Sequence, residues 1–211
     1  QTPASLVERF GVDAYRYYFL RDVAFGHDGS ISMEAMVQRY NGDLANDWGN
    51  LCSRLFNMTE KYFDGLAPAA PDRADETAED ETMRAIAGSL PETYEDHMRR
   101  LDYSAALESA WELIKYANRY IENSAPWTLA KEGDAARLAA VLYNALEAVR
   151  IAALFTAPVM PDTSAEVWRR LGLGDITEVT DILAAAEWGG LAAGSRVTKG
   201  ESLFPRIYDE E

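Results

Sequence analysis

The sequence predicts an all-α fold, a helical bundle of about five main helices preceded by a short helical lead-in. Apolar residues recur at helical spacing through most of the chain, and strand-like alternation is nearly absent. Prolines, glycines and capping residues fall between the periodic segments. The 211 residues, 48% of them hydrophobic, suffice for one sizeable domain or one domain with an appendage. We expect the lead-in over residues 1–35 and the bundle over residues 36–211.

Capping residues and glycines divide the first 65 residues. A cap-proline pair begins the chain, Asp-Gly marks a turn near residue 28, and Asn-Gly follows at residue 41. The expected elements are a helix from Pro3 closed by Gly11, a helix over 14–22 capped by Asp13, a loop over 24–32, and a helix from about 33, capped by Ser32, that meets Asn41-Gly42 and resumes to about Phe63.

Prolines punctuate the rest of the chain. The expected elements are a linker over 66–74, a helix from about 75 that Pro91 kinks or splits, a helix from Asp102 or Ser104 to about Ser124, a turn reading SAPWTLAK (124–131), a long helix from Asp134 to about Thr156 that is apolar on one side, and a short helix over 161–172. The last forty residues are weaker. They indicate a helix near 180–187 and an extended segment, SLFPRIY, at 202–208.

The net charge of −15 disfavours non-specific binding to nucleic acid, because an acidic surface repels phosphates. It leaves room for a local site where a few basic and aromatic side chains meet unpaired bases. Much of the acidity lies in residues 72–81, DRADETAEDE, which we interpret as a solvated start of a helix.

The motif search predicts a chain that is non-catalytic by itself, with no cofactor or metal of its own. It finds no phosphate loop, nucleophile motif or paired-histidine helix. The lone Cys52, between Leu51 and Leu55, is expected as a core thiol and fits a reducing cytoplasm. No apolar run approaches the roughly 18 residues that a membrane span needs. The chain also lacks an initiator Met and a signal peptide, so we expect a fragment of a longer protein or a processed one.

Two places suggest a binding site. Asn50 and Arg54 are four residues apart and share a helix face, where an amide and a guanidinium can grip the polar edge of a base. Trp127 follows Pro126 at a helix junction, where a fixed ring can serve as a stacking platform for an unpaired base. The alternatives for the first pair are a solvated face or an Asn50 side chain that bonds a neighbouring backbone, and for the second a ring that covers the end of the bundle.

At these residues the chain resembles the C-terminal part of bacterial methionyl-tRNA synthetase, a class I aminoacyl-tRNA synthetase. Residues 6–32 look like the segment after that family's KMSKS loop, and residues 39–65, with NLCSR, look like the first helices of its anticodon-binding domain. ANRYIENSAPWTLAK (117–131) is similar to its anticodon-recognition turn, and LFPRI (203–207) to its closing segment. Related enzymes for leucine, isoleucine, valine and cysteine share the helical domain, but NLCSR together with APW favours methionine.

The resemblance implies a site that reads the first base, a cytosine, of the CAU anticodon of methionine tRNA. It assigns Asn50 and Arg54 to the edge of that base and Trp127, with Pro126 before it, to its face. Asn118 and Glu122 match positions that border the pocket, and Glu122 is expected to exclude wrong bases as an unpaired acceptor. Arg21 and Arg39 are candidates for the tRNA backbone, or for surface ion pairs.

The same resemblance places the chemistry elsewhere. The family attaches methionine to its tRNA with ATP and Mg, and it carries zinc in an insertion, but its HIGH and KMSKS motifs are absent here. The expected partners are therefore the tRNA and the catalytic domain of the same enzyme. The rival hypotheses are a helical protein-interaction or structural module without RNA binding, the anticodon domain of another class I synthetase, and a self-contained enzyme.

Overall fold

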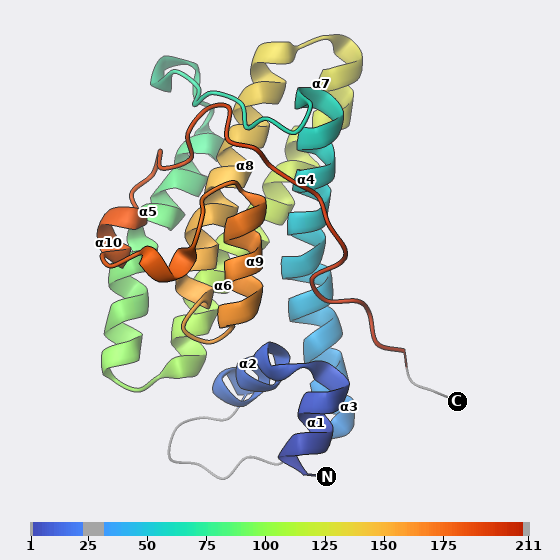
Figure 1. Ribbon diagram of the computed structural model, residues 1–211. Helices are drawn as coiled ribbons and strands as arrows, with labels where there is room; N and C mark the ends of the chain where they lie inside the picture. Colours follow the sequence, from blue (N-terminus) through green and yellow to red (C-terminus); the bar gives the residue numbers. More distant parts are fainter. Residues whose placement is uncertain (1, 23–31, 209–211) are drawn as a thin grey trace.

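The computed structural model describes residues 2–22 and 32–208, which form an all-α bundle, as predicted (Figure 1). Its elements are α1 (Pro3–Phe10), α2 (Val12–Asp22), α3 (Met33–Arg39), the π-helical η1 (Tyr40–Gly49), α4 (Asn50–Phe63), the 3-10 turn η2 (Arg73–Asp75), α5 (Ala78–Arg99), α6 (Tyr103–Ser124), α7 (Pro126–Glu132), α8 (Ala135–Thr156), α9 (Pro161–Arg170), the 3-10 turn η3 (Ile176–Glu178) and α10 (Ile182–Ala185). The described residues contain no β-strand, only one isolated bridge between Leu66 and Arg196. The predicted loop over 24–32 lies, apart from Ser32, outside the described residues.

Helix α8 is the centre of the bundle, in contact with α4, α5, α6, α7 and α9. The predicted one-sided apolar stripe is wrong, because nearly every side chain from Leu138 to Thr156 is buried. A helix surrounded by other helices buries side chains on every face. Its length and composition would also suit a membrane span, but 94% of its most apolar window is buried inside the fold, as in the core helix of a soluble protein.

A buried ion pair on α8 anchors the C-terminal part of the chain. Arg150 lies 2.6 Å from Glu147, and their side chains are 3% and 0% exposed. The Glu147 carboxylate accepts hydrogen bonds from three consecutive backbone N–H groups, those of residues 189–191, at 2.7–3.0 Å. A Cβ atom at Gly190 would lie 2.6 Å from the Arg150 guanidinium carbon, so a larger residue there would have to displace the guanidinium from its hydrogen bonds. The pair therefore fixes the segment after α10 against the core.

The N-terminal helices pack onto one end of the bundle (Figure 1). Arg16 on α2 donates to the backbone oxygens of Val159 and Pro158 at 2.7 and 2.8 Å, and the Tyr17 ring lies 4.6 Å from that of Trp111. Asp13 does not cap a helix as predicted. It lies inside the first turn of α2 and accepts from the Thr163 backbone, which ties α2 to α9. The division at residue 35 stays a prediction.

Two predicted breaks are absent, whereas a kink at Pro91 without a break stays a prediction. Helix α5 runs unbroken through Pro91, although proline removes a backbone donor. Leu90 and Tyr94, on either side of it, are buried, so packing holds the helix together. The Asn41-Gly42 pair does not break the chain either, because α3 continues through η1 into α4. The Asn41 amide instead bonds the Ile207 backbone in both directions, at 2.7 and 3.0 Å, and so holds the extended tail along this helix.

Candidate nucleic-acid interface

The first helix of the site is α4, which begins at Asn50. The Asn50 side chain is exposed and makes no hydrogen bond within the described part of the chain. Arg54 follows one turn later on the same face, with its side chain 27% exposed. Leu51, Cys52 and Leu55 point from the other face into the core. The amphipathic pattern of α4 therefore turns Asn50 and Arg54 outward together.

Trp127 stands exposed beside Arg54. Its exposed fraction is 44%, whereas Trp48, Trp111 and Trp168 are at most 5% exposed. The Arg54 guanidinium carbon lies 5.9 Å from the centre of the Trp127 ring, the outer limit of a cation–π contact. A ring that plugs the end of the bundle would be buried. The structure therefore favours a platform.

The turn before Trp127 explains this exposure. Helix α6 ends at Ser124, and Ala125 takes a left-handed conformation with φ of 42°. Pro126 is buried and begins α7, so Trp127 lies in the first turn of the short helix that follows α6. Proline at the first helical position has the required φ and loses no hydrogen bond there.

Glu122 differs from its expected role as an unpaired acceptor. Its carboxylate lies 2.6 Å from the Arg54 guanidinium, with 59% of the side chain exposed. The ion pair joins α6 to α4 directly beside the Trp127 ring. Because both side chains reach solvent, such a pair contributes only about 0–1 kcal/mol and can open at low cost.

The Asn118 side chain makes hydrogen bonds within the protein. One turn before Glu122 on α6, its amide donates to the backbone oxygens of Asp47 at 3.0 Å and Ile114 at 3.2 Å. These bonds set α6 against the π-helical stretch that precedes α4. Asn118 thus positions the stretch before α4, with its donors already used, and its place beside the pocket stays a prediction.

The two further arginine candidates are engaged in internal contacts. Arg21 donates to Ser104 at 2.8 Å and lies 3.4 Å from Glu108. Arg39 pairs with Asp22 at 2.7 Å and with Asp43 at 3.2 Å. Their geometry favours the surface ion-pair interpretation over contact with a tRNA backbone.

Other chemistry has little support among the described residues. Cys52 is fully buried, and burial raises the pKa of its thiol well above the usual range, so it is no nucleophile. No group of three His, Cys, Asp or Glu side chains within residues 2–22 and 32–208 is placed to hold a metal. A cavity of about 520 Å³ between α5 and α6 and an apolar one of about 300 Å³ beside α10 contain neither Arg54 nor Trp127 in their walls.

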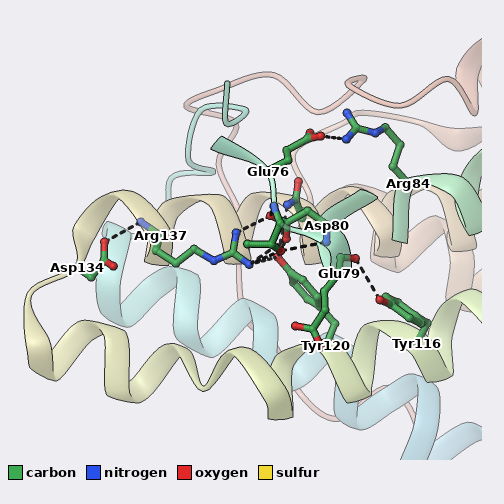
Figure 2. A network of polar contacts seen from close by, with 10 residues as sticks. Glu76, Glu79, Asp80, Arg84, Tyr116, Tyr120, Asp134 and Arg137 are labelled. Carbon is green, nitrogen blue, oxygen red and sulfur yellow. Dashed lines mark hydrogen bonds and ion pairs between the residues drawn. The ribbon is translucent and has the colours of Figure 1, made fainter. Parts of the chain in front are cut away.

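The sequence reasoning missed a polar network at the start of α5 (Figure 2). Asp80 is 1% exposed and accepts hydrogen bonds from Tyr120 on α6 at 2.5 Å and from Arg137 on α8 at 2.5 and 3.0 Å. Glu76, which pairs with Arg84, has a side chain only 6% exposed. The acidic segment 72–81 is therefore not simply a solvated helix start. Thr77 and Asp80 form a capping box, the one local signal that marked this turn.

The Asp80 network predicts a pH-dependent stability. Burial by itself raises the pKa of this carboxyl, but hydrogen bonds from Arg137, the Thr77 backbone and Tyr120 lower it to about 2. The folded-state pKa lies below the unfolded value of about 3.9, so the stabilisation is complete above the unfolded pKa and is lost as pH falls toward 2. At pH 7 we expect the free energy of unfolding of the wild type to be about 2–3 kcal/mol larger than that of Asp80→Asn. Urea unfolding of both proteins from pH 7 to pH 2.5 measures the difference, and a constant gap would contradict the assignment.

Family models match nearly the whole chain. Residues 70–211 match the anticodon binding domain of methionyl tRNA ligase, and residues 2–56 match the class I tRNA synthetases of the methionine type. The chain belongs to the methionyl-tRNA ligase family. The first match, over residues 70–211, includes the helices that carry Glu122 and Trp127. The second, over residues 2–56, includes NLCSR on α4.

Individual methionyl-tRNA ligases agree with this assignment. The chain is 46% identical over 210 residues to the methionine–tRNA ligase of Caldanaerobacter subterraneus subsp. tengcongensis, covering 99% of this chain and 32% of the relative. It is 43% identical over 219 residues to that of Streptomyces coelicolor, covering 99% and 39%. The chain thus spans about a third of the length of these curated relatives.

The fold is also similar to part of a solved methionyl-tRNA synthetase. The apo form of the Mycobacterium tuberculosis methionyl-tRNA synthetase matches with a TM-score of 0.89 at 37% identity, over 100% of this chain and 42% of that one. The same enzyme in complex with methionyl-adenylate matches with a TM-score of 0.88 at 38% identity, over 97% and 40%.

Proposed function

We propose that this chain reads the CAU anticodon of methionine tRNA as the anticodon-binding part of a methionine–tRNA ligase. The observation that carries the proposal is that the exposed Trp127 ring lies beside Arg54, which shares a helix face with Asn50, in a chain of this family. Trp127 would stack on the first anticodon base. Arg54 and Asn50 would bond its edge.

The donors and acceptors of the site suit cytosine. The Arg54 guanidinium offers parallel N–H donors, which match the adjacent O2 and N3 acceptors of that base. The Asn50 amide oxygen can accept from the cytosine amino group. Uracil carries a hydrogen on N3 and would set donor against donor. In the free protein, Glu122 pairs with Arg54 beside the ring, and this exposed pair can open at low cost when a base edge takes up the guanidinium.

The activity of the complete protein follows as part of this proposal. We infer that it attaches methionine to its tRNA with ATP, that the catalytic domain and any Mg or zinc site lie outside this chain, and that it works in the cytoplasm. The negative net charge is compatible with this function, because a base stacked on an aromatic ring adds roughly 1–3 kcal/mol without a phosphate contact.

Arg54 provides the test. We expect Arg54→Ala to weaken binding of a CAU anticodon stem-loop by about 1–3 kcal/mol, roughly 5- to 150-fold, and to reduce the preference over a UAU loop. Arg54→Lys should fail to restore that preference, because lysine lacks the planar fork. Calorimetric titration of the 211-residue chain measures both loops.

Arg99→Ala is the matched control, since it removes an arginine whose side chain is 76% exposed on α5, outside the site. It should change both affinities equally and slightly. If wild type bound CAU and UAU loops equally well, with measurable affinity, the reading pocket would be wrong. The rival interaction module predicts no specific loop binding, which the same titration reveals.

A further inference from the structure

Helix α7 is short, and it packs against the core through Pro126, Leu129 and Ala130. It has seven residues, fewer than the roughly 12–15 that an isolated helix needs even to be marginal in water. No side chain caps its N-terminus, and the Trp127 ring it carries is exposed rather than packed as an anchor. The orientation of that ring therefore depends on these few core contacts and on the two helices that flank α7.

Both flanking helices are bound by one carboxylate. Tyr120 lies one turn before the end of α6 and donates to Asp80 at 2.5 Å. Arg137 lies in the first turn of α8 and makes bonds of 2.5 and 3.0 Å to both Asp80 oxygens. Asp80 belongs to α5, a third helix (Figure 2). The segment between Tyr120 and Arg137 contains the whole of α7 and its two turns.

Neighbouring contacts strengthen the same junction. Tyr116 and Asn123, both on α6, donate to the Glu79 backbone at 3.1 Å and to its carboxylate at 2.8 Å. The Asn144 amide on α8 lies 3.4 Å from the Tyr120 hydroxyl oxygen, to which it donates. Because Asp80 and Tyr120 are almost fully buried, these bonds have little competition from water.

We propose that Asp80 is a positioning residue for anticodon binding, which fixes the α6–α7–α8 corner and thereby the stacking face of Trp127. This inference rests on the proposed function. Asp80 does not touch the RNA. It links the ends of α6 and α8, so that binding does not have to order the corner that presents the ring.

The test compares Asp80→Asn with two reference variants in the same CAU stem-loop titration. We expect Asp80→Asn to weaken binding 5- to 20-fold at pH 7 and 20 °C, under conditions where circular dichroism shows full helicity. Glu166→Gln is the matched control, because Glu166 on α9 also pairs with two arginines and has a pKa lowered to about 2. It should destabilise the fold and leave the affinity unchanged. Tyr120→Phe removes only the Tyr120 hydrogen bond to Asp80, so we expect it to weaken binding less than Asp80→Asn does.

A double-mutant cycle with Trp127→Ala separates positioning from general destabilisation. If Asp80 acts through the ring, Asp80→Asn should cost almost nothing further once Trp127 is alanine. Additive losses, or equal losses in Asp80→Asn and Glu166→Gln, would overturn the positioning role. If Trp127→Ala itself left CAU binding unchanged, the proposed function would fail instead, so the two failures are distinguishable.

Discussion

Replacing Glu147 with alanine is expected to lower the free energy of unfolding by about 3–5 kcal/mol, the range for breaking a buried ion pair from one side. The Arg150 guanidinium would keep its charge at 3% exposure without a counter-charge. Three backbone N–H groups of residues 189–191 would lose their acceptor as well. The C-terminal segment should therefore detach before the helices of the bundle unfold.

Urea unfolding followed by circular dichroism measures the loss, and limited proteolysis detects the released segment. Asp96→Ala is the control, because the Asp96–Arg100 pair at 2.9 Å is more than half exposed on both sides and should contribute about 0–1 kcal/mol. A loss for Glu147→Ala as small as that of the control would show that water or local rearrangement satisfies Arg150.

Trp127→Ala is expected to cause a large loss of CAU stem-loop affinity, about 1–3 kcal/mol. Removal of the stacking ring accounts for roughly 1–3 kcal/mol. The Arg54 guanidinium also loses the ring beside it, which lies 5.9 Å away in the free protein. The fold should be unaffected, because the side chain is 44% exposed.

Trp127→Phe distinguishes stacking from other roles of the residue, since a smaller aromatic face should retain part of the affinity. Trp188→Phe is the control, a half-buried tryptophan in the C-terminal part of the chain. Titration of each variant with the stem-loop gives the affinities. Equal binding by Trp127→Ala and wild type would rule out the stacking platform.

Local rules predicted most of the elements. Thr2 and Pro3 begin α1, Asp134 caps α8, and the spacing of apolar residues on α6 gives its buried face. These features depend on contacts within three or four residues, which the sequence states directly. The errors at Pro91 and at Asn41-Gly42 have the opposite cause, because long-range packing outweighed a local preference for a break.

The candidate site shows the same division. Spacing placed Asn50 and Arg54 on one face, and the resemblance added Trp127, Pro126, Asn118 and Glu122. That Glu122 is paired with Arg54, and that Asn118 is used to hold the backbone before α4, depends on how α6 lies against α4. No spacing within either helix contains that information.

The sequence by itself determined the class of the protein: an all-α bundle, the order of its helices, and the two segments that make it resemble the methionyl-tRNA synthetases. Only the tertiary structure decided that Trp127 stands exposed beside Arg54, and that Asp80 and Glu147 are buried network centres rather than solvated acids. The physical reason is range. Helix formation and capping depend on neighbours along the chain, whereas exposure, ion pairing and a shifted pKa depend on which distant helices come to lie beside a side chain.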